Sequence, residues 1–203
     1  MKTRIISIVV VLSFSILVSA QGIEKKPEKI YKNAFSISLA TLPLGNFQLN
    51  YERSLNSAWA IKIGIGATFV DKDDRKKEGL NSEIYLKYYV LDKDREKKFY
   101  NIYFSPYVEY KNTSVTFYDE DTRIGTGRQV VTYNSIGGGF LFGQYFVLGK
   151  RLVLDLYFGG GIRTNFSSGE DNYLYNQVYD RTFLQDVYRG IIGKIGLDIG
   201  FKF

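Results

Sequence analysis

An eight-stranded antiparallel up-and-down transmembrane β-barrel is the fold that this sequence predicts, and three observations point to it. Apolar and polar residues alternate through eight segments between Asn33 and Phe203, as the side chains of a strand do when they point to opposite faces of a sheet. The alternation is clearest in the last segment, where Lys194, Asp198 and several glycines share the polar face. After the N-terminal segment, no apolar run approaches the roughly 20 residues of a spanning helix. Membrane insertion would therefore use strands, which must close into a barrel because lipid tolerates no open sheet edge.

The N-terminal segment has the layout of a secretory signal peptide. Two basic residues precede the apolar stretch Ile5–Val18, and Val18–Ala20 resembles a small-residue cleavage site. A transmembrane helix is the alternative, but this stretch is shorter than a span and contains two serines. The expected organisation is a cleaved signal peptide at 1–20, a polar periplasmic leader at 21–32 and an outer-membrane β-barrel at 33–203.

The composition narrows the possible functions. Without residues 1–20 the chain has 25 basic and 21 acidic residues, a net charge of +4, and the two signs are interspersed, which argues against a nucleic-acid surface. There is no cysteine, so no disulfide is available. Histidine is also absent, which removes the usual general base and the commonest metal ligand. We therefore expect a non-enzymatic protein without a cofactor, a metal or a nucleic-acid partner.

The first three strands are regular and are separated by turn residues. Residues 33–42 lead to the turn Pro43–Asn46, and residues 47–55 end at an Asn-Ser turn. Residues 58–70 place isoleucines on one face against lysine, glycine and threonine on the other.

The next three strands are less uniform. The fourth, residues 81–91, follows the charged stretch Asp71–Glu78. The fifth starts at Phe99, and Pro106 within it predicts a bulge or local kink because proline cannot donate to a ladder. The sixth, about residues 130–146, is the least regular because three consecutive glycines blur its phase.

The seventh strand, residues 151–166, is regular, and residues 191–203 form the eighth. If the chain starts in the periplasm, every second connection faces outside and belongs to the longer type. The connections expected outside are 43–46, 71–80, 112–128 and 167–189, and the expected periplasmic turns are 55–57, 92–98 and 147–150. The three longest connections fall outside, and 43–46 is an exception because it is as short as a turn.

Alternation alone also fits a soluble periplasmic lipocalin-like barrel that buries its apolar face around an apolar ligand, and this is the alternative. Glycines on the polar face and aromatic residues near strand ends favour the membrane barrel. In that case the charges of both signs lie in a narrow lumen, where pairing is needed because an isolated buried charge costs several kcal/mol. The expected charge network consists of Lys62, Glu83, Lys87, Glu109, Asp155, Arg163, Lys194 and Asp198.

Two segments resemble an uncharacterised family of small Gram-negative outer-membrane β-barrel proteins, a domain of unknown function similar in architecture to OmpA- or OmpX-type eight-stranded barrels. Gly45–Leu55 resembles the family's glycine, short strand and Tyr-Glu-Arg opening, and Leu148–Asp155 with Gly159–Gly161 resembles its late turn and strand. The resemblance implies a barrel in the cell outer membrane with no established activity and no catalytic residues.

The expected function is a structural or surface-interaction role for a barrel whose lumen is filled by side chains. The expected partners are outer-membrane lipid and lipopolysaccharide, the outer-membrane barrel assembly machinery, and an extracellular protein or glycan. Phe201 and Phe203 are the candidate assembly signal at the C-terminus. The candidate surface-contact residues are the loop aromatics Tyr173, Tyr175, Tyr179, Phe183 and Tyr188. The alternative for this loop is a hairpin whose aromatic residues pack on one another.

Overall fold

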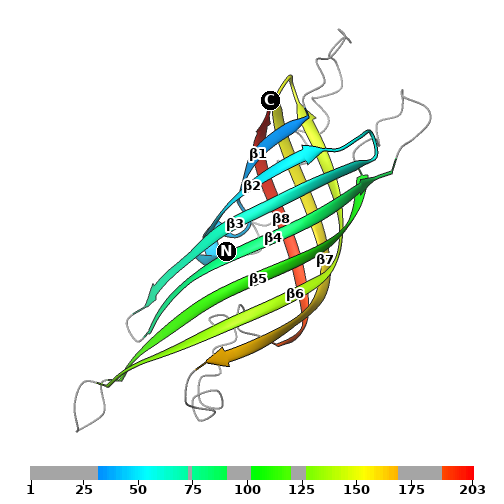
Figure 1. The fold of residues 1–203 in the computed structure, drawn as a ribbon. Helices are drawn as coiled ribbons and strands as arrows, with labels where there is room; N and C mark the ends of the chain where they lie inside the picture. Colours follow the sequence, from blue (N-terminus) through cyan, green and yellow to red (C-terminus); the bar gives the residue numbers. More distant parts are fainter. Residues whose placement is uncertain (1–31, 73–74, 91–101, 120–126, 169–188) are drawn as a thin grey trace, which may run out of the picture.

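Eight antiparallel strands form a closed barrel in the computed structural model, which describes residues 32–72, 75–90, 102–119, 127–168 and 189–203 (Figure 1). Each strand pairs with its neighbours in the chain, and the last pairs with the first. The strands are β1 (Asn33–Ser38), β2 (Asn46–Ser54), β3 (Trp59–Lys72), β4 (Arg75–Tyr89), β5 (Ile102–Asp119), β6 (Gly127–Leu148), β7 (Leu152–Ser168) and β8 (Gly190–Lys202). The predicted fold class, an all-β eight-stranded antiparallel barrel, is confirmed. Among the residues that the structure describes, no helix is long and apolar enough to cross a membrane.

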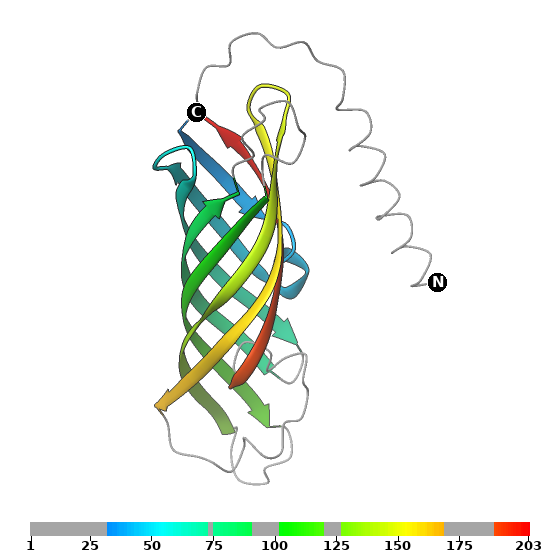
Figure 2. The ribbon, with the colours of Figure 1, turned by 90° about the vertical axis from the view of Figure 1, so that its right-hand side faces the viewer.

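Strand length changes steadily around the barrel. It rises from 6 residues in β1 to 22 in β6 and falls to 13 in β8. Figure 2 shows the long strands on one side of the molecule and the short β1 on another. The expected connections 71–80 and 112–128 were therefore too long, because β3 and β4 leave only residues 73–74 between them and β5 and β6 leave only 120–126. These strand ends carry polar residues on both faces, so the alternation that reveals the rest of each strand is lost there.

The connection between β1 and β2 also differs from the expectation. The strand predicted at 33–42 ends at Ser38, and the chain then forms a turn with a 3-10 helix at Leu42–Leu44. Pro43 suits the first turn of this helix, where its missing N–H costs nothing. Gly45 closes the helix in the left-handed region with φ 74°, and its N–H donates to the Leu42 carbonyl at 2.9 Å. The connection therefore spans residues 39–45 rather than 43–46.

Two irregularities that the sequence suggested do not disturb the register. Tyr107 lies opposite Tyr85 and Phe104 lies opposite Tyr88, so the offset between β4 and β5 is the same on both sides of Pro106. No residue is inserted, so the bulge is absent, and Pro106 keeps its place opposite Phe140 in β6. The ladder with β4 is interrupted there, since Ser105 and Pro106 have no paired residue in β4, and the alternative of a local kink stays a prediction. The glycines of β6 also leave its phase unchanged, because Ser135 before them and Leu141 after them are both buried inside the barrel.

Candidate functional site

The two faces of the barrel wall have opposite chemistry, and the apolar face is the outer one. Every strand exposes at least one large apolar side chain on the outside: Phe35, Leu49, Ile65, Ile84, Val108, Phe140, Phe158 and Ile195. The charged side chains of the expected network lie inside, with Lys62 only 1% exposed and Asp198 fully buried. A soluble barrel has the reverse arrangement, so the lipocalin-like alternative does not fit. The fold and the lumen define a transmembrane β-barrel.

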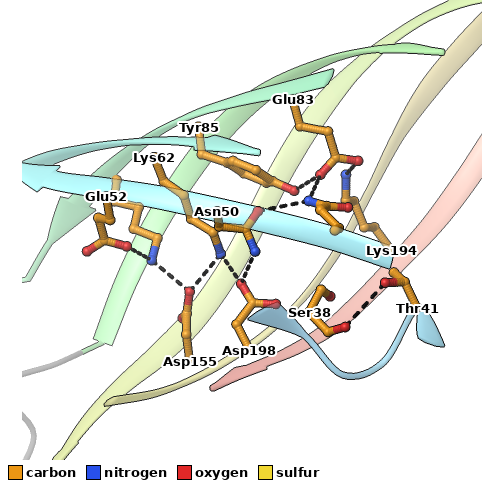
Figure 3. A network of polar contacts seen from close by, with 12 residues as sticks. Ser38, Thr41, Asn50, Glu52, Lys62, Glu83, Tyr85, Asp155, Lys194 and Asp198 are labelled. Carbon is orange, nitrogen blue, oxygen red and sulfur yellow. Dashed lines mark hydrogen bonds and ion pairs between the residues drawn. The ribbon is translucent and has the colours of Figure 1, made fainter. Parts of the chain in front are cut away.

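One half of the lumen holds a cluster of two lysines and three carboxylates. Lys62 from β3 pairs with Asp155 from β7 at 3.0 Å, and it also pairs with Asp198 from β8. Lys87 from β4 pairs with Glu52 from β2 at 2.6 Å and with Asp155 at 2.7 Å. Figure 3 shows Lys62, Asp155 and Asp198 converging from different strands. Asp155 is the centre of the cluster because one of its oxygens contacts both lysines.

The other half of the lumen holds a second cluster. The ammonium of Lys194 from β8 lies 2.7 Å from a Glu83 oxygen and 3.1 Å from a Glu109 oxygen, so it joins β4 to β5. The guanidinium of Arg163 from β7 binds the second oxygen of Glu109, with Nε donating at 2.8 Å. The eight residues expected to form the lumen network thus all lie inside the barrel, divided between these two clusters.

Two amide side chains of β2 connect the clusters. Gln48 donates from Nε2 to Glu83 and to the side-chain oxygen of Asn50, both at 2.9 Å. Asn50 in turn donates from Nδ2 to Asp198 at 3.2 Å. The result is one continuous polar network, the lumen network, whose members are Gln48, Asn50, Glu52, Lys62, Glu83, Lys87, Glu109, Asp155, Arg163, Lys194 and Asp198.

Glu52 and the two amides were not among the predicted network residues, although the alternation of strand 47–55 places all three on its polar face. The amides carry no charge, so the requirement for charge pairing did not identify them. Alternation indicates which face a residue occupies, whereas its partner depends on how the barrel closes. Lys62 and Asp155, for example, are 93 positions apart in the chain.

Buried tyrosines fill the space around the lumen network. They are Tyr85, Tyr103, Tyr107, Tyr145 and Tyr157, each at most 5% exposed. The Tyr103 hydroxyl donates to Asp155 at 2.8 Å, and the ammonium of Lys87 lies 4.4 Å from the centre of the Tyr103 ring. Glycines make room for the rings, because a Cβ at Gly143 would overlap Tyr103 and one at Gly196 would overlap Tyr157. Sequence reasoning did not identify this aromatic layer, although the tyrosines occupy the same alternating positions as the charges.

The arrangement suits charge neutralisation. Each of Lys62, Lys87 and Lys194 lies between two carboxylates, and Arg163 binds a carboxylate as well. Such pairing offsets much of the cost of burying charge in a narrow interior. Within the described residues, no group of three or more acidic side chains is placed to hold a metal ion.

The C-terminal phenylalanines lie on the outside of the barrel at the seam between β1 and β8. Phe203 exchanges two backbone hydrogen bonds with Asn33, at 2.9 and 3.3 Å, and its ring stacks on that of Phe35 with centroids 5.3 Å apart. Phe201 lies opposite Phe35 in the ladder, and the Arg151 guanidinium is 5.4 Å from its ring centre. The candidate surface-contact residues Tyr173, Tyr175, Tyr179, Phe183 and Tyr188 lie outside the described residues.

No protein-family model matches the chain, and no curated protein matches it. The resemblance to an uncharacterised barrel family therefore stays a prediction. Solved structures similar to this chain include the N-terminal β-barrel domain of Pseudomonas aeruginosa OprF, with 13% identity over 85% of this chain and 98% of that chain and a TM-score of 0.34. A major outer membrane protein from Thermus thermophilus is 16% identical over 84% of this chain and 99% of that chain, with a TM-score of 0.44. Acinetobacter baumannii CarO is 11% identical over 88% of this chain and 100% of that chain, with a TM-score of 0.43. At these low identities and TM-scores, the likenesses say nothing about what this chain binds or does.

Proposed function

We propose that this protein is a non-enzymatic β-barrel of the cell outer membrane whose lumen is closed by its own side chains, and that its role is structural or one of surface interaction. The observation that carries the proposal is the continuous lumen network, which runs from Glu52 in one half of the barrel to Arg163 in the other. A solute crossing the barrel would have to separate ion pairs that are shielded from water. Breaking a buried pair without a replacement partner costs about 3–5 kcal/mol.

The tyrosine layer supports the same proposal. Eight strands leave an interior just wide enough for side chains. Here large rings occupy it, with Tyr85 and Tyr107 centred 6.0 Å apart and Tyr85 and Tyr157 centred 6.2 Å apart. The interior is therefore packed between the ion pairs as well as cross-linked by them.

A surface-interaction role is supported by the strand ends farthest from the C-terminus. There polar side chains enter the outer face of the wall beside apolar ones such as Phe166, as Tyr110 and Asn112 both donate to the side chain of Asn134, at 2.8 and 2.7 Å. Lys76 and Glu78 form an exposed ion pair on the same face. Paired polar side chains on an outer face suit water rather than lipid, so the ends of these hairpins would stand clear of the membrane and be available for contact.

In planar lipid bilayers we expect the purified protein to give no large, stable single-channel currents, because the lumen network and the tyrosines fill its interior. A double variant, Tyr107→Ala with Lys194→Ala, removes a ring and the ammonium that lies 4.5 Å from its centre, and should pass measurable current. The matched control Lys76→Ala changes an exposed side chain and should stay closed. Large stable currents from the unmodified protein would contradict the closed lumen.

We expect deletion of Phe203 to impair membrane assembly more than Phe201→Leu. The deletion removes the last two backbone hydrogen bonds of the seam and the ring stacked on Phe35, whereas leucine at 201 keeps an apolar side chain and all backbone groups. The measurement is the fraction of heat-modifiable protein recovered in the outer-membrane fraction. Equal recovery of both variants would contradict a special role for Phe203, and absence of the unmodified protein from that fraction would contradict the location.

A further inference from the structure

The seam between β1 and β8 is paired over only part of the length of β8. β1 lies opposite residues 198–202, and one further backbone bond runs from Leu39 N–H to the Leu197 carbonyl at 2.7 Å. On its other side β8 is paired with β7 throughout, from Gly190 to Phe201. Figure 1 shows β8 continuing well past the end of β1. Among the described residues, the segment 190–196 therefore has a strand neighbour on one side only.

The direction of the backbone groups identifies which residues form this free edge. Successive N–H and C=O pairs of a strand point to opposite sides in the plane of the sheet. Leu197 and Phe203 use theirs toward β1, whereas Lys202 donates to Arg151 on the side of β7. The same alternation points the backbone groups of Ile191, Gly193 and Ile195 away from β7, where the described part of the chain offers them no partner.

The turn at 39–45 does not cover this edge. Within the described residues, only Leu39, its first residue, makes a backbone bond to β8. The Thr41 carbonyl instead accepts from the N–H groups of Leu44 in the turn and of Asn46 in β2, both at 3.1 Å. The Gly45 carbonyl accepts from Phe69 N–H in β3 at 2.8 Å. Beyond Leu39, the turn is thus tied to the far side of the gap rather than to β8.

The side chains beside the free edge are apolar and unusually exposed. Ile191 is 82% exposed and Ile195 is 78% exposed, the two highest values among the exposed large apolar side chains. Gly193 lies between them, and a Cβ placed there would meet nothing within 4 Å. The neighbouring outward residues of β7, Phe158 and Ile162, are also strongly exposed. This part of the wall therefore faces lipid, where acyl chains cannot satisfy free N–H and C=O groups.

We propose that the free edge of β8, at Ile191, Gly193 and Ile195, is a docking site for an extended segment of a partner polypeptide, which adds a strand to the barrel wall. Two features of the edge favour this occupant. The N–H and C=O groups of the three residues repeat at the spacing of a β-ladder, and the backbone of another extended segment has the same spacing. The docked strand would also continue the existing β1–β8 ladder beyond Leu197. The proposal concerns the wall of the barrel and holds whether the lumen is closed or open.

The edge also specifies the chemistry of the partner segment. Residues directly opposite one another share a face, so the positions across from Ile191 and Ile195 point to lipid and should be apolar. An aromatic residue fits across from Gly193, because its ring can cover the space that the missing side chain leaves. The positions between them point to the inner face, toward Ile192 and Lys194, and should be small or polar.

A second copy of this chain is a poorer fit. Two β8 edges that pair in antiparallel fashion would place the two copies in opposite orientations across the membrane, whereas copies inserted by one route share an orientation. A parallel pair would require two tilted strands to cross at a large angle. A separate extended segment has neither constraint.

The test uses the full barrel reconstituted in lipid nanodiscs, with residue-resolved amide hydrogen exchange as the readout. The probe is an acetylated and amidated peptide, Thr-Val-Ser-Phe-Ser-Val-Thr, which carries the required alternation. We expect it to slow exchange at Ile191, Gly193 and Ile195 by at least tenfold. Exchange at Ile192 and Lys194 should not change, because their N–H groups already face β7.

Two controls test the backbone mechanism. Gly193→Pro removes an N–H that has no partner among the described residues, so it should fold normally and lose peptide protection, whereas Gly193→Ala keeps the N–H and should retain protection. A peptide that is N-methylated at its phenylalanine should give no protection of the three amides in the unmodified protein. This control makes the test independent of how the proline variant folds. The proposal is overturned if the peptide leaves exchange unchanged. It is also overturned if, without peptide, the three amides are already as protected as that of Ile192. If that protection without peptide disappears on dilution, the partner is a second copy of this chain, which overturns the proposal as well.

Discussion

Replacing Asp155 with alanine is expected to destabilise the barrel by about 3–5 kcal/mol, the range for removing one partner of a buried ion pair. Asp155 is 3% exposed and contacts both Lys62 and Lys87, which are each 1% exposed. The truncation leaves two buried ammonium groups with one carboxylate partner each and deprives the Tyr103 hydroxyl of its acceptor. Asp155→Asn keeps an oxygen for Tyr103 and should cost less than alanine.

Urea unfolding of the reconstituted protein, followed by the heat-dependent gel shift, measures this loss. Glu78→Ala is the matched control, because Glu78 belongs to an exposed ion pair with Lys76 and such pairs contribute about 0–1 kcal/mol. A loss for Asp155→Ala no larger than that for Glu78→Ala would show that the lumen network does not stabilise the barrel.

Gly139→Ala should also have a large effect, about 3 kcal/mol, at the upper end of the usual range for overpacking. Gly139 in β6 lies opposite Gly161 in β7, and a Cβ at Gly139 would overlap the carbonyl oxygen of Gly160. The obstacle is main chain rather than a flexible side chain, so the substitution can be accommodated only if the two strands move apart.

Gly193→Ala is the control for this prediction, since it is the same chemical change in a strand of the same barrel. Its Cβ meets nothing within 4 Å, so stability should be unchanged or rise by up to about 1 kcal/mol through the lower entropy of the unfolded chain. Equal effects of the two substitutions on stability would mean that the close approach of β6 and β7 does not require a glycine at position 139.

The sequence predicts those parts of the fold in which the two faces of a strand meet different surroundings. β8 was expected at 191–203 and lies at Gly190–Lys202, because lipid on one side and a charged lumen on the other impose strict alternation. The strand ends at Arg75–Gly79 were expected to be a loop, since polar residues occupy both faces there. The turn at 39–45 was misjudged at its start, because Leu39 continues the apolar face of Phe35 and Ile37 and so extends the pattern past the end of the strand.

The candidate site could be predicted in composition but not in connectivity. Alternation placed Lys62 and Asp198 in the lumen, and the need for pairing indicated that partners of opposite sign would be nearby. It could not show that Lys62 shares Asp155 with Lys87, because that depends on the stagger with which the strands close. The bridge through Gln48 and Asn50 was missed for a related reason, since neutral amides carry no charge that requires a partner.

The unequal strand lengths give the barrel an oblique rim, low at β1 and β2 and high at β5 and β6. The high side carries polar side chains on its outer face, so its extra height stands in water rather than in lipid. The low side ends at the turn that exposes Leu42 and Leu44. A molecule approaching along the membrane surface would therefore reach the end of the barrel over β1 and β2, whereas from the opposite side it would meet the wall of β5 and β6. Access to the barrel end would depend on the direction of approach.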